Sequence, residues 1–554
     1  MIECRDALVT VTTPALKAIF DRGWLVSLRC GVTGEVWVDA PAPDASALQI
    51  VHVPDDAVDV ADRRSGRVEV IALSPSRAQV RFHGWDADGV LDVGVDEATG
   101  EVLVEPAASS ARPGVLACRW RLPRVRPGLD LVAPFFQGVR LPPGDPLLQR
   151  RWTWPQWWEA GLAILQGGNG GWWVHCRDVR YRHKALHIAD GALALDTEAY
   201  GPVDCNRASG GLAWRIGVHT GGWHEAAEKY RRWLWGAYGL GRQESRRKPW
   251  QSDIRLALCW YNGDIEVLEA LAEAVDPRAT LIHFSAWRTD RYDQNYPDYV
   301  ASQEALKAFE RASALGFHVM PHCNAVDMDP TNPAYALVRD FVYRDVVSGR
   351  ALGWAWDPAA GGMDVPNSGR ALQENRSRNV MVKVHPGLSL WRSLLAERVQ
   401  RAVRQTGTDA VFLDVTLCSH NLRESLVEGT TSTEGMGRLI DEISQIDGGL
   451  AVGGEGLNEI TMQAHSFAQV HLFTSWQRNC EGLARTGGCD LNARLFGRLC
   501  RTIGYSGLGG RTDDEELRMR LHEEHGAIPT ITVGSAEDIR HPTRAVRRAL
   551  EGAR

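Results

Sequence analysis

The sequence has no long apolar segment and no regular cysteine spacing. No run of about 18 apolar residues occurs, so a membrane-spanning helix is not expected. The first residues, Met1 to Asp6, contain no apolar core of a secretory signal. The 11 cysteines are scattered without a CxxC pair, which is typical of reduced thiols rather than of a disulfide framework. These absences predict a cytoplasmic protein with no membrane partner.

Positive charge is not in excess either. Lys and Arg number 62 against 69 Asp and Glu, which gives a formal net charge of −7 at pH 7. Proteins that bind nucleic acid usually carry basic patches or long Lys/Arg-rich blocks, and none stands out here. We therefore expect no nucleic-acid partner. The sequence does not indicate the oligomeric state.

Three common catalytic motifs are also missing. There is no P-loop, and the glycine-rich segment Gly167–Gly171 leads into a predicted strand, so it does not place a helix N-terminus next to a phosphate. Tyr505–Gly507 lacks the GxSxG frame of serine hydrolases. In His522–His525 the second histidine comes one residue too early for the HExxH motif. We therefore expect no cofactor.

Several histidines could instead be ligands of a metal ion. His283, His318, His322 and His385 lie on or near predicted strands, and barrel-shaped hydrolases gather such residues around zinc. The spacing of His318 and His322 is unfavourable, however, because Pro321 weakens the strand that would carry both. We predict no metal site, and a metal-dependent hydrolase remains an alternative function.

The first part of the chain is rich in predicted β-strands. Its 554 residues, 44% hydrophobic and 24% charged, are sufficient for several folded domains. Short alternating runs separated by Gly, Asp and Pro recur up to about residue 220, and residues 67–83 and 91–104 each predict a hairpin. We predict an antiparallel β-sandwich domain over residues 1–240 that ends in a helix containing residues 224–235.

After a charged segment, residues 241–252, which predicts a linker, the pattern changes to alternating strands and helices. Residues 253–554 therefore predict a (β/α)8 barrel of the TIM type. The expected barrel strands, besides those that contain Asp414 and Glu455, are 254–260, 280–287, 317–321, 470–473, 498–503 and 528–533. Helices are expected at 303–314 and at 389–406, with Ser389 as the N-cap and Gly407 beyond the end.

Two acidic residues follow short apolar runs in this second part. Asp414 ends Ala410–Asp414, and Glu455 ends Leu450–Glu455 between two glycines. Both runs predict buried strands, and a helical stretch of suitable length separates them. Because the C-terminal ends of barrel strands meet at the catalytic rim, we expect the two carboxyl groups to face one cleft. Two such groups are the minimum equipment for cleaving a glycosidic bond. Glu459 is a rival for the acid/base role.

Other polar and aromatic residues also stand at predicted strand ends, where they could contact hydroxyl groups. The 21 tryptophans exceed the 12 phenylalanines, and we expect most to fill the core and some to stack on sugar rings. The predicted substrate-binding residues are Trp260, Trp287, Tyr292, Asp293, His322, Asn324, Lys383, His385 and Trp476.

These segments resemble bacterial glycoside hydrolase-like barrel proteins related to the endo-α-N-acetylgalactosaminidase group, including uncharacterised relatives. The resemblance rests on Phe412–Asp414, on Gly453–Gly456, and on Trp287 with the Tyr296-Pro297 loop. It implies a β-sandwich ahead of a catalytic barrel, which the opening Phe20–Val26 also suggests. It further implies a retaining enzyme for α-linked sugars, with Asp414 as nucleophile and Glu455 as acid/base.

The sequence therefore predicts a glycosidase that acts on a carbohydrate substrate with α-linkages. Three other functions remain open on the same barrel. These are a metal-dependent hydrolase, a sugar lyase, and a carbohydrate-binding protein that has lost catalysis.

Overall fold

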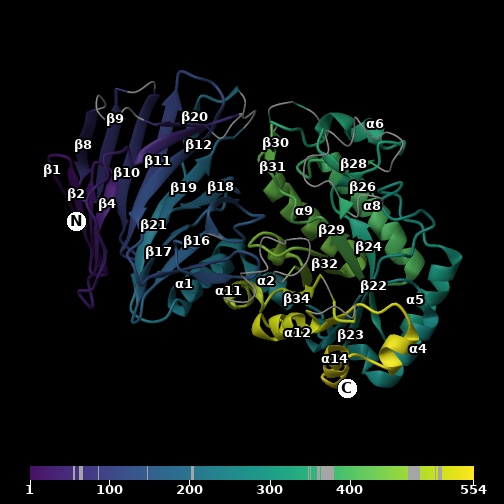
Figure 1. Cartoon of the computed structure of the whole chain (residues 1–554). Coiled ribbons are helices and arrows are strands. Elements are labelled where there is room, and N and C mark those ends of the chain that lie inside the picture. Colours follow the sequence, from purple (N-terminus) through teal and green to yellow (C-terminus); the bar gives the residue numbers. More distant parts are fainter. Residues whose placement is uncertain are drawn as a thin grey trace. The chain divides into compact units, whose positions relative to one another are not determined.

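The computed structural model describes the 554-residue chain except for 54–56, 61–66, 85–86, 146–147, 201–204, 347–348, 350, 358–361, 364–379, 424, 472–486, 506 and 510–513. The chain forms two compact units. The first is built mainly from Met1–Trp233, and the second mainly from Leu234–Asp345, Gly349–Ser419 and Leu426–Arg554. Figure 1 colours the first unit purple to blue and the second teal to yellow.

The first unit is built from antiparallel sheets, as predicted. Its five-stranded sheet has the order β1 (Ile2–Arg5), β2 (Leu8–Thr12), β3 (Leu16–Asp21), β4 (Trp24–Cys30) and β5 (Val36–Asp39). The largest sheet runs β14 (Val139–Leu141), β13 (Asp130–Ala133), β16 (Leu162–Gln166), β17 (Gly171–Cys176), β21 (Trp214–His219), β11 (Glu101–Ser110), β10 (Ala87–Asp96), β9 (Arg77–His83) and β8 (Arg67–Ser74), with β20 (Ala208–Gly210) beside β11. The third sheet runs β15 (Arg150–Thr153), β18 (Lys184–Ala189), β19 (Ala192–Glu198), β12 (Val115–Arg124), β6 (Leu48–His52) and β7 (Ala57–Val60).

Alternating burial explains why these strands pack face to face. In β9, Ala78, Val80 and Phe82 are buried while the residues between them are more exposed, as expected for a strand with one face in a core. Strands β10 and β11 contact β6 and β12 of the third sheet, which closes the sandwich. The predicted hairpins β8–β9 and β10–β11 are confirmed. Fully buried tryptophans of this unit include Trp24, Trp37, Trp120, Trp152, Trp158, Trp172, Trp173 and Trp214.

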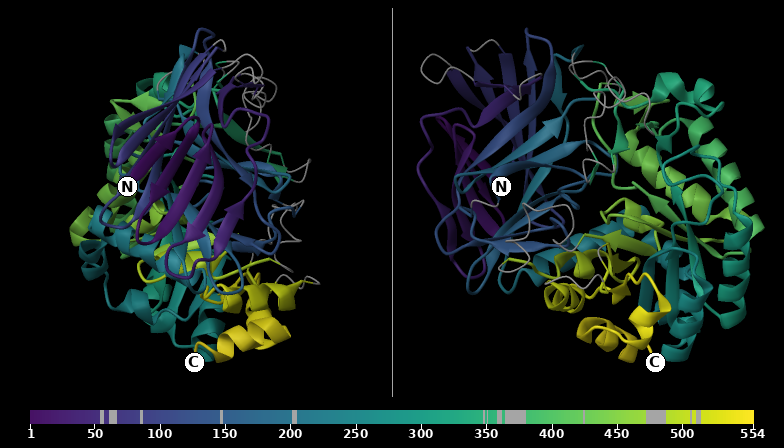
Figure 2. Two further views of the ribbon diagram at one scale, coloured as in Figure 1. Left: turned by 90° about the vertical axis from the view of Figure 1, so that its left-hand side faces the viewer. Right: turned by 45° about the vertical axis from the view of Figure 1, so that its right-hand side comes forward.

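The second unit is a parallel barrel of eight strands, again as predicted (Figures 1 and 2). Its strands follow in the order β34 (Arg501–Gly504), β33 (Phe467–Val470), β32 (Ala451–Glu455), β29 (Ala410–Asp414), β24 (His318–Asn324), β23 (Thr280–Phe284), β22 (Leu256–Tyr261) and β35 (Thr530–Ile531). Parallel bridges from Ile503 to Ile528 and from Leu508 to Ile531 link the two ends. The sixth strand, β33, begins three residues earlier than predicted, because the buried polar Gln469 interrupts its apolar pattern.

Helices cover the outside of the barrel (Figure 1). The described helices of the second unit are α2 (Leu240–Ser245), α3 (Trp250–Asp253), α4 (Ile265–Ala274), α5 (Gln303–Leu315), α6 (Tyr335–Val338), α8 (Ser389–Thr406), α9 (Ser432–Ser444), α11 (Leu491–Phe496), α12 (Glu515–Glu524), α13 (Ala536–Arg540) and α14 (Arg544–Glu551). Helix α1 (His224–Tyr238) belongs mostly to the first unit, which extends to Trp233. Helices α2 and α3 lie in the segment expected to be a linker. As predicted, α8 ends before Gly407, which adopts a left-handed conformation, but Leu388 rather than Ser389 is its N-cap. Within the described residues, no helix has the length and hydropathy of a membrane span.

An insertion between β24 and β29 adds a small antiparallel sheet to the barrel. Its strands are β25 (Asp327–Met328), β28 (Val380–Lys383), β26 (Gly353–Asp357) and β27 (Gly362–Met363). Strand β25 follows directly after the C-terminal end of β24. The insertion therefore adds its own side chains to the rim at which the barrel strands end.

Candidate active site

Asp414 and Glu455 end neighbouring parallel strands of the barrel. Asp414 is the last residue of β29 and Glu455 the last residue of β32. Val415 leaves β29 with φ 62°, a conformation that β-branched residues rarely adopt, and its N–H donates a hydrogen bond of 3.2 Å to Glu455 Oε2. Both side chains are largely buried, with 5% of Asp414 and 8% of Glu455 exposed. The structure therefore brings the predicted pair together at one rim.

Two hydrogen-bond donors face the Asp414 carboxylate. The Tyr292 hydroxyl donates to Asp414 Oδ2 at 3.3 Å, and His322 Nε2 lies 3.6 Å from the same oxygen. Burial lowers the pKa of His283 to about 3 and the pKa of His322 well below its ordinary value, so both rings are neutral. The backbone N–H of Trp260 donates to His283 Nδ1 at 3.5 Å, and His283 Nε2 lies 3.0 Å from His322 Nδ1. This series of hydrogen bonds leaves the proton of His322 on Nε2, which faces Asp414.

Lys383 and Asp327 form a buried ion pair across the inserted sheet. The register of β25 and β28 pairs the two residues directly, and Lys383 Nζ lies 2.7 Å from Asp327 Oδ1. The Asn324 side-chain amide donates to Asp327 Oδ2 at 3.0 Å, while its oxygen accepts from the N–H groups of Val326 and Asp327. Asn324, predicted to bind substrate, is thus engaged in orienting Asp327. The ammonium of Lys383 supplies positive charge beside the acidic residues.

Four carboxyl groups shape the electrostatics of this rim. Burial raises the pKa of Asp414 well above its ordinary value, the charges of Glu455, Asp327 and Asp293 raise it further, and Lys383 opposes the rise. Burial, followed by the charge of Asp327, raises the pKa of Asp293 to about 7. Neighbouring carboxylates resist ionising together, so the site retains protons near neutral pH. A carboxylic acid and a carboxylate can therefore coexist here.

Aromatic rings line the same rim. The ring of Trp260 meets those of Tyr292 and Tyr505 edge to face, at centroid distances of 6.4 Å and 5.5 Å. Tyr505 stacks on His471 at 4.4 Å, and His471 Nε2 lies 3.5 Å from Glu455 Oε1. Sequence reasoning did not select Tyr505 or His471 for this site. Both directly follow barrel strands, β34 and β33, so correct placement of those strands would have identified them.

The remaining predicted residues have other surroundings. Trp287 is fully buried, and its Nε1–H donates to the carbonyl of His322 at 2.9 Å, so it supports that residue from within the core. His385 accepts a backbone N–H at 2.9 Å in the turn that leads into α8. Glu459, the rival acid, is 2% exposed in the segment between β32 and a short 3-10 helix. Trp476 lies outside the described residues.

Of the four histidines considered as metal ligands, His283 and His322 lie in contact, but His318 does not join them. His318 begins β24 and His322 lies four residues further on, a separation of about 13 Å along a strand. His318 stacks on Trp250 and faces Asp409 at 3.6 Å, whereas His322 faces Asp414. In the part of the chain that the structure describes, no group of three or more His, Cys, Asp or Glu side chains could hold a metal ion.

A protein-family model matches part of the chain. It is described as a domain of unknown function, DUF6259, and it matches residues 212–438. No curated protein matches the chain.

Solved structures share its architecture at low sequence identity. The α-N-acetylgalactosaminidase NagBb from Bifidobacterium bifidum is 12% identical with a TM-score of 0.68, over 100% of this chain and 93% of that one. The same enzyme in complex with GalNAc is 13% identical with a TM-score of 0.69, over 100% and 92%. The GH36 α-galactosidase AgaA from Geobacillus stearothermophilus is 10% identical with a TM-score of 0.51, over 98% and 85%. The chain thus has the fold of these glycoside hydrolase barrel proteins.

Proposed function

We propose that this protein is a retaining glycosidase for α-linked sugars. The observation that carries the proposal is the pair of buried carboxyl groups at the ends of β29 and β32, linked through the Val415 N–H. A glycosidase needs one carboxylate and one carboxylic acid flanking the scissile bond. The fold likeness to an α-N-acetylgalactosaminidase and to α-galactosidases supports α-galactosides and N-acetyl-α-galactosaminides as the first substrates to test.

We assign the nucleophile to Asp414, because its carboxylate faces two donors. The Tyr292 hydroxyl and the His322 Nε2–H both stabilise negative charge on Asp414 Oδ2. In the first step, the carboxylate attacks the anomeric carbon as the bond to the leaving oxygen breaks, and a covalent glycosyl-enzyme forms. Burial and the neighbouring carboxylates raise the pKa of Asp414 in the free protein, so attack requires that Asp414 lose this proton when substrate binds.

We assign the acid/base role to Glu455. It would donate its proton to the leaving oxygen in the first step, and then accept a proton from the water that attacks the anomeric carbon and releases Asp414. Substrate binding would be shared by the ion pair of Lys383 with Asp327, by Asp293, and by the aromatic rings of the rim. Hydroxyl groups bind well to such charged and polar partners, and sugar C–H faces bind to flat rings.

The test is a screen of aryl α- and β-glycosides, with NMR identification of the anomer released first. We expect release of the α-anomer from an aryl N-acetyl-α-galactosaminide or α-galactoside. Release of the β-anomer first would contradict the retaining mechanism. Binding of these sugars without turnover would instead support a carbohydrate-binding protein.

Three variants assign the roles. Asp414→Asn should lower kcat by several orders of magnitude, since it removes the nucleophile. Glu455→Gln should lower kcat about 100-fold to 10,000-fold for substrates with poor leaving groups, and much less for activated aryl glycosides that need no proton. The matched control is Glu459→Gln, four residues away. If Glu459→Gln shows the leaving-group dependence and Glu455→Gln does not, the acid/base assignment is wrong.

A further inference from the structure

A cavity of about 530 Å³ lies at the amino ends of two barrel strands, away from the catalytic rim. Helices α2 and α3 form one wall, and the segments that lead into β32 and β33 form another. Leu450, in the wall, directly precedes β32, and Glu455 ends that strand. A strand rises roughly 3.3 Å per residue, so the two residues are about 16 Å apart. The cavity is therefore separate from the proposed active site, and its volume suits a small organic ligand.

The cavity is lined by three consecutive cations and by no carboxylate. Arg246, Arg247 and Lys248 all contribute to its surface. Among the residues that the structure describes, none of the three has a carboxylate within ion-pair distance. Two acidic residues of this region have other partners: Asp441 accepts hydrogen bonds from Gln243 and Gln445, and Asp409 lies 3.6 Å from His318. Asp409 also interacts electrostatically with Lys248, so the positive charge of the cavity is only partly balanced locally.

Arg247 is the most deeply placed of the three. Its guanidinium donates to Ser466 Oγ at 2.6 Å, to the Ala464 carbonyl at 3.3 Å and to the His465 carbonyl. These partners are uncharged, and its Nε is buried with no hydrogen-bond partner. Burial lowers the pKa of Arg247, because a desolvated cation without a counter-ion is costly. An anion in the cavity would relieve this cost.

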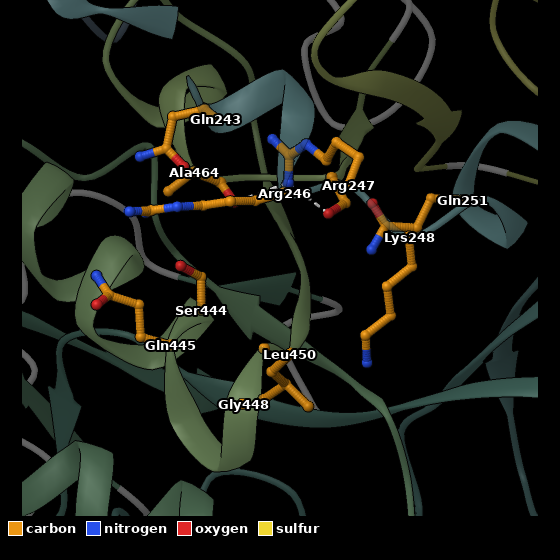
Figure 3. Close-up of a pocket in the computed structure, with 12 residues that line it drawn as sticks. Gln243, Arg246, Arg247, Lys248, Gln251, Ser444, Gln445, Gly448, Leu450 and Ala464 are labelled. Atoms are coloured by element: carbon orange, nitrogen blue, oxygen red, sulfur yellow. Dashed lines mark hydrogen bonds between the residues drawn. The ribbon is translucent and has the colours of Figure 1, made fainter. Parts of the chain in front are cut away.

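Polar side chains surround the space that such an anion would occupy. Figure 3 shows Lys248 and Gln251 on one side, and Ser444 and Gln445 on the other. Gln251 is 7% exposed, and its side-chain oxygen is buried without a hydrogen-bond partner. Leu450 and Ala464 add an apolar part to the wall.

We propose that this cavity binds a small phosphate ester, with the phosphate group held by Arg246 and Lys248 and assisted by Gln251. A phosphate ester is close to a dianion at pH 7 and balances more of the three positive charges than a sulfate ester or a carboxylate. The volume leaves room for the organic part of the ligand beside Leu450. This site does not depend on the proposed glycosidase function, since it is built at the other end of β32.

The test is isothermal titration calorimetry of the full chain at low salt with galactose 6-phosphate, galactose 6-sulfate and galactose. We expect saturable binding of galactose 6-phosphate, weaker binding of the sulfate and none of galactose. The double variant Arg246→Gln/Lys248→Gln should weaken phosphate-ester binding about 100-fold, because each charge-assisted hydrogen bond contributes roughly tenfold. Binding should also weaken as salt concentration rises.

The matched control is Arg242→Gln, a basic residue of α2 that does not line the cavity. We expect it to retain the affinity of the unmodified chain within about twofold, since the charge it removes is screened by solvent. Arg247 is left in place because it is tied to three acceptors of the fold. Absence of saturable phosphate-ester binding, equal or tighter binding of the sulfate, or an equal loss in Arg242→Gln would each overturn the proposal.

Discussion

The raised pKa of Asp293 should make the free energy of unfolding depend on pH. The substitution Asp293→Asn should remove this dependence. The residue is 3% exposed, and its Oδ1 is buried with no hydrogen-bond partner. Burial and the charge of Asp327 raise its pKa from 3.8 to about 7. At about 1.4 kcal/mol for each tenfold change in proton affinity, this rise corresponds to roughly 4 kcal/mol.

The sign follows from which state holds more protons. Between about pH 4 and pH 7 the folded state keeps the Asp293 proton and the unfolded state releases it. The free energy of unfolding therefore falls as the pH rises through this window, and does not change further above it. Asp293→Asn, which stays neutral at every pH, should lack this contribution. The variant and the unmodified chain should unfold at similar temperatures near pH 4, and the variant should be several degrees more stable at pH 8.

The assay is thermal unfolding of both chains at intervals from pH 4 to pH 8. Asp340→Asn is the control, because the side chain of Asp340 is 81% exposed and its removal should leave the pH profile unchanged. A difference between Asp293→Asn and the unmodified chain that stays constant across this range would refute the reasoning. It would mean that Asp293 ionises in the folded state as readily as it does in the unfolded chain.

Three further substitutions test other parts of the barrel. Lys383→Met should lower the free energy of unfolding by about 3–5 kcal/mol in urea titrations, because it leaves Asp327 buried without its cation; an unchanged midpoint would contradict the ion pair. Gly454→Ala should lower thermal stability, by roughly 1–3 kcal/mol, because the added Cβ would collide with the His465 ring; full stability would show that this ring can move. Thr431→Ala should cost about 1 kcal/mol in the same titrations, since Thr431 caps α9, and Thr431→Ser should restore most of it.

The sequence by itself predicted both folded units and the central acidic pair. Periodicity and turn residues are local properties, so the hairpins β8–β9 and β10–β11 and the helices α5 and α8 could be read directly. The pattern of strand and helix also placed Asp414 and Glu455 at the ends of successive strands. Parallel barrel strands end at one rim, and this rule is sufficient to bring the two carboxyl groups together.

The surroundings of that pair depend on contacts between segments far apart in the sequence. The register of β25 and β28 joins Asp327 to Lys383 across an insertion that has no local pattern of its own. Packing between strands buries Trp287 and links His283 to His322. The elevated pKa values arise in the same way, because they depend on how much solvent is excluded and on which charges lie nearby. The sequence thus determined that Asp414 and Glu455 meet, and only the tertiary structure decided which other charges surround them and raise the pKa of Asp414.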